Sequence, residues 1–278
     1  MLRLPRMSLV DPTARQSPVT HFYHYQPFHK KYLTDMLRDQ MIHFSHPHNV
    51  NDPWDCKPWF DYRPMLADPE KREAMITAFR SLLPQETLDD PQRPIYEDLL
   101  RKNDGVMRKH IERFSLGLAG ELSSRRIYCL TPFPDNTLMW SHYAANHKGI
   151  CLEFANNNPL IGHARPVRYK TDYPEFIPQS YGPGRDGNAL ELVLTKAMDW
   201  GYEKEWRIIA SGLDGPMKLH DSDFVKLPPG ALTAIIIGCE NRDHPEITDI
   251  VKQYQPDVKI KWALRVPNIF KLVISDTP

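Results

Sequence analysis

Two glutamates at the start of one predicted strand have the spacing of a catalytic pair. If YEKEWRII at 202–209 is extended, its side chains alternate, so Glu203, Glu205 and Arg207 share one face and the two carboxylates lie about 7 Å apart. In such a pair, one carboxylate can stay ionised and stabilise a developing cation while the other accepts or positions a proton. This arrangement suits cleavage of a ribosyl or glycosyl bond. The alternative is a solvated strand face with a Glu205–Arg207 ion pair.

A helix predicted at 137–148 carries aromatic and hydrogen-bonding side chains close together. In TLMWSHYAANHK, Trp140 and Tyr143 are three residues apart and share a face, with Ser141 and His142 beside them. Two aromatic rings, an imidazole and a hydroxyl so placed could stack on a planar ligand and bind its substituents. The alternative is that Trp140 and Tyr143 fill the hydrophobic core. His142 is harder to explain in that way, because an amphipathic helix rarely needs an imidazole beside its apolar stripe.

A third set of polar residues lies near the beginning of the chain. HFYHY at 21–25 predicts an aromatic-rich strand on which His24 points away from its tyrosine neighbours. The later NDPWD is typical of a turn in which Asx side chains bind the local backbone, although Asn51 and Asp52 could instead line a site. The spacing of the histidines and aspartates in this region matches no well-defined metal site, so no metal is expected.

Composition narrows the class of protein. The chain has 278 residues with 35 basic and 35 acidic side chains, and this balance argues against nonspecific binding to a polyanion. Its four cysteines form no CxxC pair and are expected to be buried thiols. No apolar run reaches the roughly 18 residues that span a bilayer. We therefore expect a cytoplasmic protein without a membrane segment, in which residues 1–19 form a flexible tail.

The order of the predicted elements indicates an α+β fold. Apolar spacing predicts helices at 31–40, 69–83, 95–122 (with a break near Asn103), 189–200 and 244–254. Short β-rich segments predict strands at 21–25, 41–45, 125–131, 150–154, 164–170, 203–211, 223–227, 233–239 and 258–266. With 26 prolines and no glycine-rich nucleotide turn, a mixed, mainly antiparallel sheet is favoured. We predict a single domain at 20–278 with an inserted helical subdomain at about 67–122.

Taken together, the motifs resemble a widespread bacterial family known only as a domain of unknown function. The resemblance runs from an aromatic opening strand through NDPWD, MWSHYA and KGICLEF to WGYEKEWRII, and covers about Phe22 to Cys239. The opening strand of that family usually reads LYKYR. Here it reads FYHYQ, with His24 and Gln26 at the basic positions, so an anion-binding role for the family's arginine is not implied.

A second resemblance, to the ADP-ribosyltransferase group, implies a reaction. Those enzymes combine an early strand bearing His or Arg, a middle Ser, Thr or Tyr, and a late E-x-E, and the corresponding residues occur here in that order: His24, Thr131 or Tyr143, and Glu203-Lys-Glu205. The resemblance implies that Glu205 stabilises a ribosyl cation and orients the ribose of NAD, while Glu203 steers the acceptor. It also implies that His24 holds the adenine-side ribose and that Trp140 or Tyr143 stacks on nicotinamide.

Three functions follow as hypotheses. The first is an NAD-using ADP-ribosyl transferase or hydrolase-like enzyme with a nucleic acid or protein acceptor, an activity that in bacteria often belongs to toxin or phage-defence systems. On this hypothesis, Glu205, His24 and Tyr143 converge on one cleft. The second is a noncatalytic sensor or binding module whose pocket recognises a small ligand or nucleotide. The third, ranked lowest, is a metal-dependent nuclease that uses the early histidines and aspartates.

Overall fold

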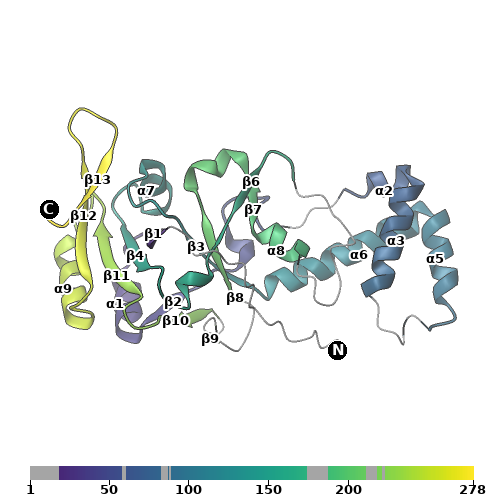
Figure 1. Ribbon diagram of the computed structural model, residues 1–278, viewed down its shortest axis with the longest axis horizontal. Coiled ribbons are helices and arrows are strands. Elements are labelled where there is room, and N and C mark those ends of the chain that lie inside the picture. Colours follow the sequence, from purple (N-terminus) through teal and green to yellow (C-terminus); the bar gives the residue numbers. More distant parts are fainter. Residues whose placement is uncertain are drawn as a thin grey trace. The chain divides into compact units, whose positions relative to one another are not determined.

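The computed structural model describes residues 19–57, 61–82, 87, 89–173, 187–210, 218–220 and 223–278 (Figure 1). The chain divides into two compact units. Unit 1 contains Pro47–Ser124 and Lys170–Ala197, and unit 2 contains residues 19–46, Arg125–Tyr169 and Met198–Pro278. Each unit has its own hydrophobic core. The predicted tail at 1–19 lies outside the described residues, except for its last residue.

Unit 1 is mainly helical. Its elements are η1 (Pro47–Asn49), α2 (Arg63–Ala67), α3 (Pro69–Leu82), α5 (Arg93–Lys102), α6 (Asp104–Ser123), α8 (Gly187–Val193) and β7 (Thr195–Ala197). The predicted break at Asn103 separates α5 from α6, and the side chain of Asn103 accepts a hydrogen bond from the N–H of Val106. The helices predicted at about 67–122 fall within this unit. No helix in the described part of the chain is long and apolar enough to cross a bilayer.

Unit 2 contains most of the strands. Its five-stranded sheet has the order β1 (His21–Gln26), β4 (Ile150–Ala155), β11 (Leu232–Ile237), β12 (Lys259–Arg265) and β13 (Leu272–Ser275). Two three-stranded sheets have the orders β2 (Met41–His43), β10 (Phe224–Lys226), β9 (Leu219–His220) and β3 (Arg126–Leu130), β8 (Trp206–Ala210), β5 (Arg165–Pro166). The unit also contains η2 (Ile161–His163) and η4 (Met198–Glu203), and β6 (Arg168–Lys170) follows β5.

The strand pairings confirm the predicted α+β fold. Within the described part of these three sheets, every pairing is antiparallel except that of β11 with β12. Parallel neighbours need a crossover connection, and here it is α9 (His244–Tyr254). The sheet is therefore mixed and mainly antiparallel. Strand β13 was not predicted, and the predicted helix at 189–200 is divided among α8, β7 and η4.

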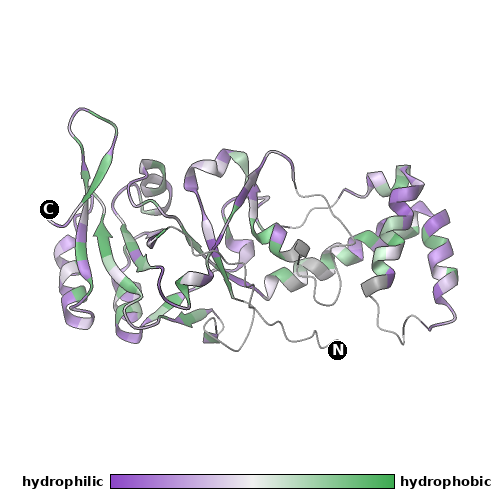
Figure 2. Ribbon diagram, in the orientation of Figure 1, coloured by the Kyte–Doolittle hydropathy of each residue, from purple (hydrophilic) through white to green (hydrophobic). Residues whose placement is uncertain are grey.

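Helices pack on both faces of the five-stranded sheet. On one face, Phe22 packs with apolar residues of α1 (Lys30–Asp39) and α9 in the larger core cluster of unit 2, and these two helices lie together in Figure 1. On the other face, Tyr25 packs with residues of α7 (Thr137–Tyr143). Figure 2 shows β11 as hydrophobic, as expected for a central strand that is buried on both faces.

Backbone segments approach one another closely at one end of this sheet. A Cβ on Gly149 would collide with the carbonyl of Gln26, and a Cβ on Gly238 would collide with the carbonyl of His147. The N–H of Gly238 also donates to the carbonyl of Gly149, at 3.1 Å. The three residues at 145–147 have positive φ angles between 48° and 66°, a region that residues other than glycine seldom adopt.

Left-handed residues also explain where two sequence predictions are wrong. The helix predicted to 148 ends at Tyr143, because residues 145–147 cannot continue it. The strand predicted from 203 begins at Trp206, because Glu203 ends η4 and Lys204 has a φ of 47°. The alternation that placed Glu203 and Glu205 on one strand face therefore does not apply.

The cysteines agree in part with expectation. All four are free thiols, so no disulfide joins them. Cys56 and Cys151 are buried as predicted, whereas Cys129 and Cys239 are partly exposed.

The close backbone approach predicts an asymmetry between two glycine substitutions. Gly149→Ala should lower the free energy of unfolding by about 1 to 3 kcal/mol, because the added methyl group displaces the end of β1. Gly117→Ala, in α6 where a Cβ meets nothing within 4 Å, should raise it by about 0.5 to 1 kcal/mol. Urea unfolding of both variants measures the difference, and effects of the same sign would contradict this packing.

Candidate ligand-binding site

The end of β1 places two polar side chains on the face of the sheet that α1 and α9 cover. His24 pairs with Leu152 and Gln26 pairs with Ile150 in the antiparallel register with β4. Directly paired residues share a face, and both apolar partners belong to the larger core cluster. Tyr25, which lies between the two polar residues, packs on the opposite face. A strand that is apolar at Phe22 thus becomes polar on its buried side.

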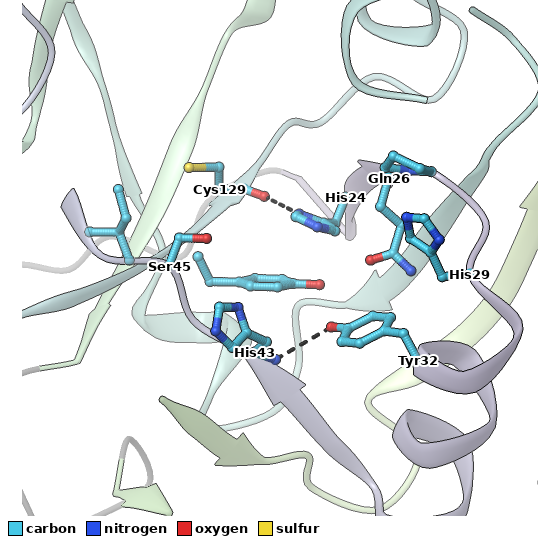
Figure 3. Close-up of a pocket in the computed structure, with 10 residues that line it drawn as sticks. His24, Gln26, His29, Tyr32, His43, Ser45 and Cys129 are labelled. Atoms are coloured by element: carbon cyan, nitrogen blue, oxygen red, sulfur yellow. Dashed lines mark hydrogen bonds between the residues drawn. The ribbon is translucent and has the colours of Figure 1, made fainter. Parts of the chain in front are cut away.

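A pocket of about 270 Å³ lies beside these side chains (Figure 3). Its polar lining comes from α1, β3, and β1 and β2 with the segments that follow them, and includes His24, Gln26, His29, Tyr32, His43, Ser45 and Tyr128. We call it the histidine pocket. None of the described residues that line it is a lysine, an arginine or a carboxylate. The volume is slightly below the usual range for small-molecule sites, so it suits a compact ligand.

His24 is held in one neutral form. Its Nδ1 lies 2.8 Å from the carbonyl oxygen of Cys129, and because a carbonyl can only accept, Nδ1 is assigned the proton. Burial lowers the pKa of His24 from 6.5 to about 4, so the ring is neutral at pH 7 and Nε2 keeps its lone pair. The ring stacks on Tyr128, with centroids 4.3 Å apart and planes 21° apart. His24 is therefore a fixed hydrogen-bond acceptor in the lining.

Two buried polar groups of this pocket have no hydrogen-bond partner among the described residues. They are Nε2 of Gln26, which is 9% exposed, and the hydroxyl of Tyr128, which is 2% exposed. Burial holds the pKa of Tyr128 well above its usual value, so the phenol stays protonated and can donate. A buried polar group left unsatisfied costs on the order of 1 to 3 kcal/mol. A ligand that accepts from both groups would recover this free energy.

A carboxylate lies near one histidine of the pocket. Nε2 of His43 is 3.9 Å from Asp223, and Nε2 of His46 is 3.8 Å from the same carboxylate. Arg126 forms an ion pair with Asp223, and its hydrogen bond is the main cause that lowers the pKa of Asp223. Both histidine distances exceed those of a direct hydrogen bond, so Asp223 is bound chiefly to Arg126.

The predicted catalytic residue Glu203 is buried in a separate network. The hydroxyl of Tyr143 donates to Oε1 of Glu203 at 2.6 Å, and the hydroxyl of Thr131 donates to the carbonyl oxygen of Glu203 at 2.7 Å. The side chain of Asn136 donates to the carbonyl of Tyr202, the residue that precedes Glu203. Because Asn136 also caps the N-terminus of α7, these contacts connect α7 to η4.

The second predicted catalytic residue, Glu205, forms a buried ion pair. Nε and Nη2 of Arg207 donate to the two carboxylate oxygens of Glu205 at 2.7 and 2.8 Å. The side chain of Arg207 is fully buried and that of Glu205 is 5% exposed. The backbone N–H of Glu205 donates to the hydroxyl of Tyr169 at 2.7 Å. The ion pair that was the alternative interpretation is therefore present, but it is buried and not solvated.

On α7, the residues expected to stack on a ring differ in exposure. Trp140 is fully buried, and its indole N–H donates to the carbonyl of Pro134. It packs edge-on against Tyr25, so it fills the core, which was the alternative interpretation for this residue. His142 is exposed, and Oγ of Ser141 lies 3.2 Å from Nε2 of His147.

The sheet of β3 and β8 separates Glu205 from His24. Arg207 pairs directly with Cys129, and Tyr128 pairs with the next residue of β8. Because neighbouring residues of a strand point to opposite faces, Arg207 and Tyr128 project from opposite sides of this sheet. His24 stacks on Tyr128, whereas Glu205 is bound to Arg207.

Tyr143 is also separated from His24. It packs with the cluster that contains Tyr25, on the face of the five-stranded sheet opposite to His24. The structure thus joins Thr131, Tyr143 and Glu203 in one network and places His24 elsewhere. The described contacts do not bring Glu205, His24 and Tyr143 together at one cleft.

Asn51 and Asp52 belong to unit 1. Oδ1 of Asp52 accepts the backbone N–H of Trp54 at 2.9 Å, which is the Asx turn predicted for NDPWD. Asp52 is buried and Asn51 is exposed. In the part of the chain that the structure describes, no group of three or more His, Cys, Asp or Glu residues could hold a metal ion.

Comparison with known families gives one match. Residues 139–208 match the family model described as protein of unknown function (DUF2971). The predicted resemblance to a family of unknown function is confirmed. The MWSHYA, KGICLEF and YEKEWR motifs lie inside the matched segment, and NDPWD lies outside it. No curated protein and no solved structure matches the chain, so the similarity to ADP-ribosyltransferases is not shown.

Sequence reasoning missed most of the residues that line the pocket. Tyr32, Ser45 and Tyr128 come from three separate parts of the chain, and nothing in their spacing shows that they meet. Gln26 could have been predicted as a site residue. Phe22, His24 and Gln26 occupy alternate positions and therefore share one face of the strand, and Phe22 marks that face as buried. Two successive polar residues on a buried face require hydrogen-bond partners.

The lowered pKa of His24 predicts a pH-dependent loss of stability. Above pH 6.5 the ring is neutral in the folded and the unfolded chain. As the pH falls from 6.5 towards 4, the unfolded chain takes up the proton first, and the free energy of unfolding decreases by at most about 3 kcal/mol. Chemical denaturation at pH 7 and pH 4.5 should show a larger loss for wild type than for His24→Gln. Equal losses would show that His24 does not carry this dependence.

Proposed function

We propose that the protein is a binding module that holds a small polar ligand in the histidine pocket. The observation that carries this proposal is a pair of buried groups at one pocket, Nε2 of Gln26 and the hydroxyl of Tyr128, that have no hydrogen-bond partner among the described residues. Folded proteins satisfy most of their buried polar groups, so two exceptions in one lining indicate a site kept for another molecule. Supporting this, His24 is fixed in the acceptor form by Cys129.

The geometry supports binding better than NAD-dependent transfer. A carboxylate that stabilises a ribosyl cation must face the reacting atom, yet both oxygens of Glu205 are bound by Arg207. The carboxylate of Glu203 accepts from Tyr143. Removing one partner of a buried ion pair costs about 3 to 5 kcal/mol, so these contacts favour a structural role. ADP-ribosyl transfer with NAD as cosubstrate and a nucleic acid or protein acceptor therefore ranks below ligand binding as a proposal.

Two tyrosine substitutions test whether the pocket holds an unsatisfied hydroxyl. Tyr128→Phe should leave the free energy of unfolding of the ligand-free protein unchanged or raise it by up to about 1 kcal/mol, because it removes a buried hydroxyl that has no partner in the described part of the chain. Tyr25→Phe is the matched control, since that buried hydroxyl donates to the carbonyl of Phe133 at 2.7 Å. Tyr25→Phe should lower the free energy by about 1 kcal/mol. Urea denaturation measures both.

One result of the comparison between Tyr128→Phe and Tyr25→Phe would contradict the proposal. If Tyr128→Phe destabilises the protein as much as Tyr25→Phe, the Tyr128 hydroxyl is already satisfied by ordered water, and the proposal fails. The transferase hypothesis is tested separately by incubating the wild-type protein with NAD. Ligand binding alone predicts no release of nicotinamide, whereas release that Glu205→Gln abolishes would establish the enzyme.

A further inference from the structure

The lining of the histidine pocket also indicates the chemistry of its ligand. We infer that the ligand is uncharged and presents a hydrogen-bond acceptor beside a donor, as a carboxamide or the lactam edge of a nucleobase does. This inference rests on the proposed function, because it assigns a ligand class to the same pocket. It follows from three features: the charge of the lining, its donors and acceptors, and its dimensions.

The charge of the lining disfavours an ion. His24 is neutral at pH 7, and no lysine, arginine or carboxylate is among the described residues that line the pocket. Burying an ionised group without an opposite charge costs several kcal/mol. The nearby carboxylate of Asp223 would repel an anion and is itself bound to Arg126. A neutral ligand avoids both costs.

The donors and the acceptor of the lining are complementary to an amide edge. The Tyr128 hydroxyl and Nε2 of Gln26 are donors without described partners, so they require an acceptor such as a carbonyl oxygen. Nε2 of His24 is an acceptor, because Nδ1 holds the proton and donates to Cys129. It can accept from an N–H donor of a ligand. A carboxamide or a lactam presents both groups side by side.

The three groups are near enough to contact one small molecule. His24 and Gln26 are two residues apart on one face of β1, which places their side chains about 7 Å apart along the strand. The ring of Tyr128 is stacked on His24 at 4.3 Å. Figure 3 shows His24 and Gln26 on the same side of the pocket, across from Tyr32 and His43. A volume of about 270 Å³ accommodates a single-ring compound.

A matched series of single-ring compounds tests the ligand class. The probes are nicotinamide, nicotinate and methyl nicotinate, which share a ring and differ in carrying a carboxamide, a carboxylate or an ester without a donor. Titration by ligand-observed NMR should show nicotinamide binding at least about tenfold more tightly than either analogue, because a site built around hydrogen bonds rejects compounds that lack the matching group. Uracil, which has a lactam edge, should bind in competition with nicotinamide.

Three variants place the binding in the histidine pocket. Gln26→Leu and Tyr128→Phe each remove one donor and should weaken nicotinamide binding at least about tenfold. His142→Ala changes an exposed histidine of α7 outside the lining and should leave the affinity unchanged. If nicotinamide binds equally well to all three variants, it occupies another site and the inference is overturned.

The remaining outcomes separate this inference from the proposed function. Tighter binding of nicotinate, still weakened by Tyr128→Phe, would overturn the neutral ligand class and leave the pocket as a binding site. Absence of binding for all four probes would overturn the amide class. In that case the tyrosine stability comparison, which needs no ligand, still decides whether the pocket is a site.

Discussion

The antiparallel register of β1 with β4 is the constraint on which the rest of unit 2 depends. Because side chains alternate along a strand, a slip by one residue would exchange every residue of β1 between the two faces of the sheet. The register is held by Gly149, whose position leaves no room for a side chain beside the carbonyl of Gln26. On its other edge, β1 is joined to Thr131, the residue after β3, by two backbone hydrogen bonds of Tyr23 at 2.8 and 2.9 Å. These contacts decide that His24 and Gln26 meet Tyr128.

Two sets of buried polar groups in unit 2 differ in whether they have hydrogen-bond partners. Both oxygens of Glu205 are bound by Arg207, and the carboxylate of Glu203 accepts from Tyr143. Each of these buried side chains therefore has a hydrogen-bond partner, as stable burial requires. In the histidine pocket, by contrast, Gln26 and Tyr128 each keep a polar group that has no partner among the residues that the structure describes. This contrast is the reason that the proposed ligand site is the histidine pocket and not the network of Glu203 and Glu205.

The sequence was sufficient for the fold class and insufficient for the site, for physical reasons. Apolar periodicity is local, so it predicted α3, α9 and the break at Asn103. The left-handed backbone of Lys204 has no signal in the local residue types, and it ended the alternation on which the Glu203 and Glu205 pair relied. The pocket joins residues more than 100 positions apart, such as His24 and Cys129. The family match at 139–208 confirms the motifs but contains none of the residues that line the pocket.

The central claim is that the functional face of β1 is the one that carries His24. Nitrogen-15 NMR of the histidine side chains tests it most directly. At pH 7 we expect His24 to be neutral with the proton on Nδ1. Adding nicotinamide should shift the Nε2 resonance of His24 and leave the resonances of His142 unchanged. A protonated His24, or a ligand that shifts His142 and leaves His24 unchanged, would contradict the account.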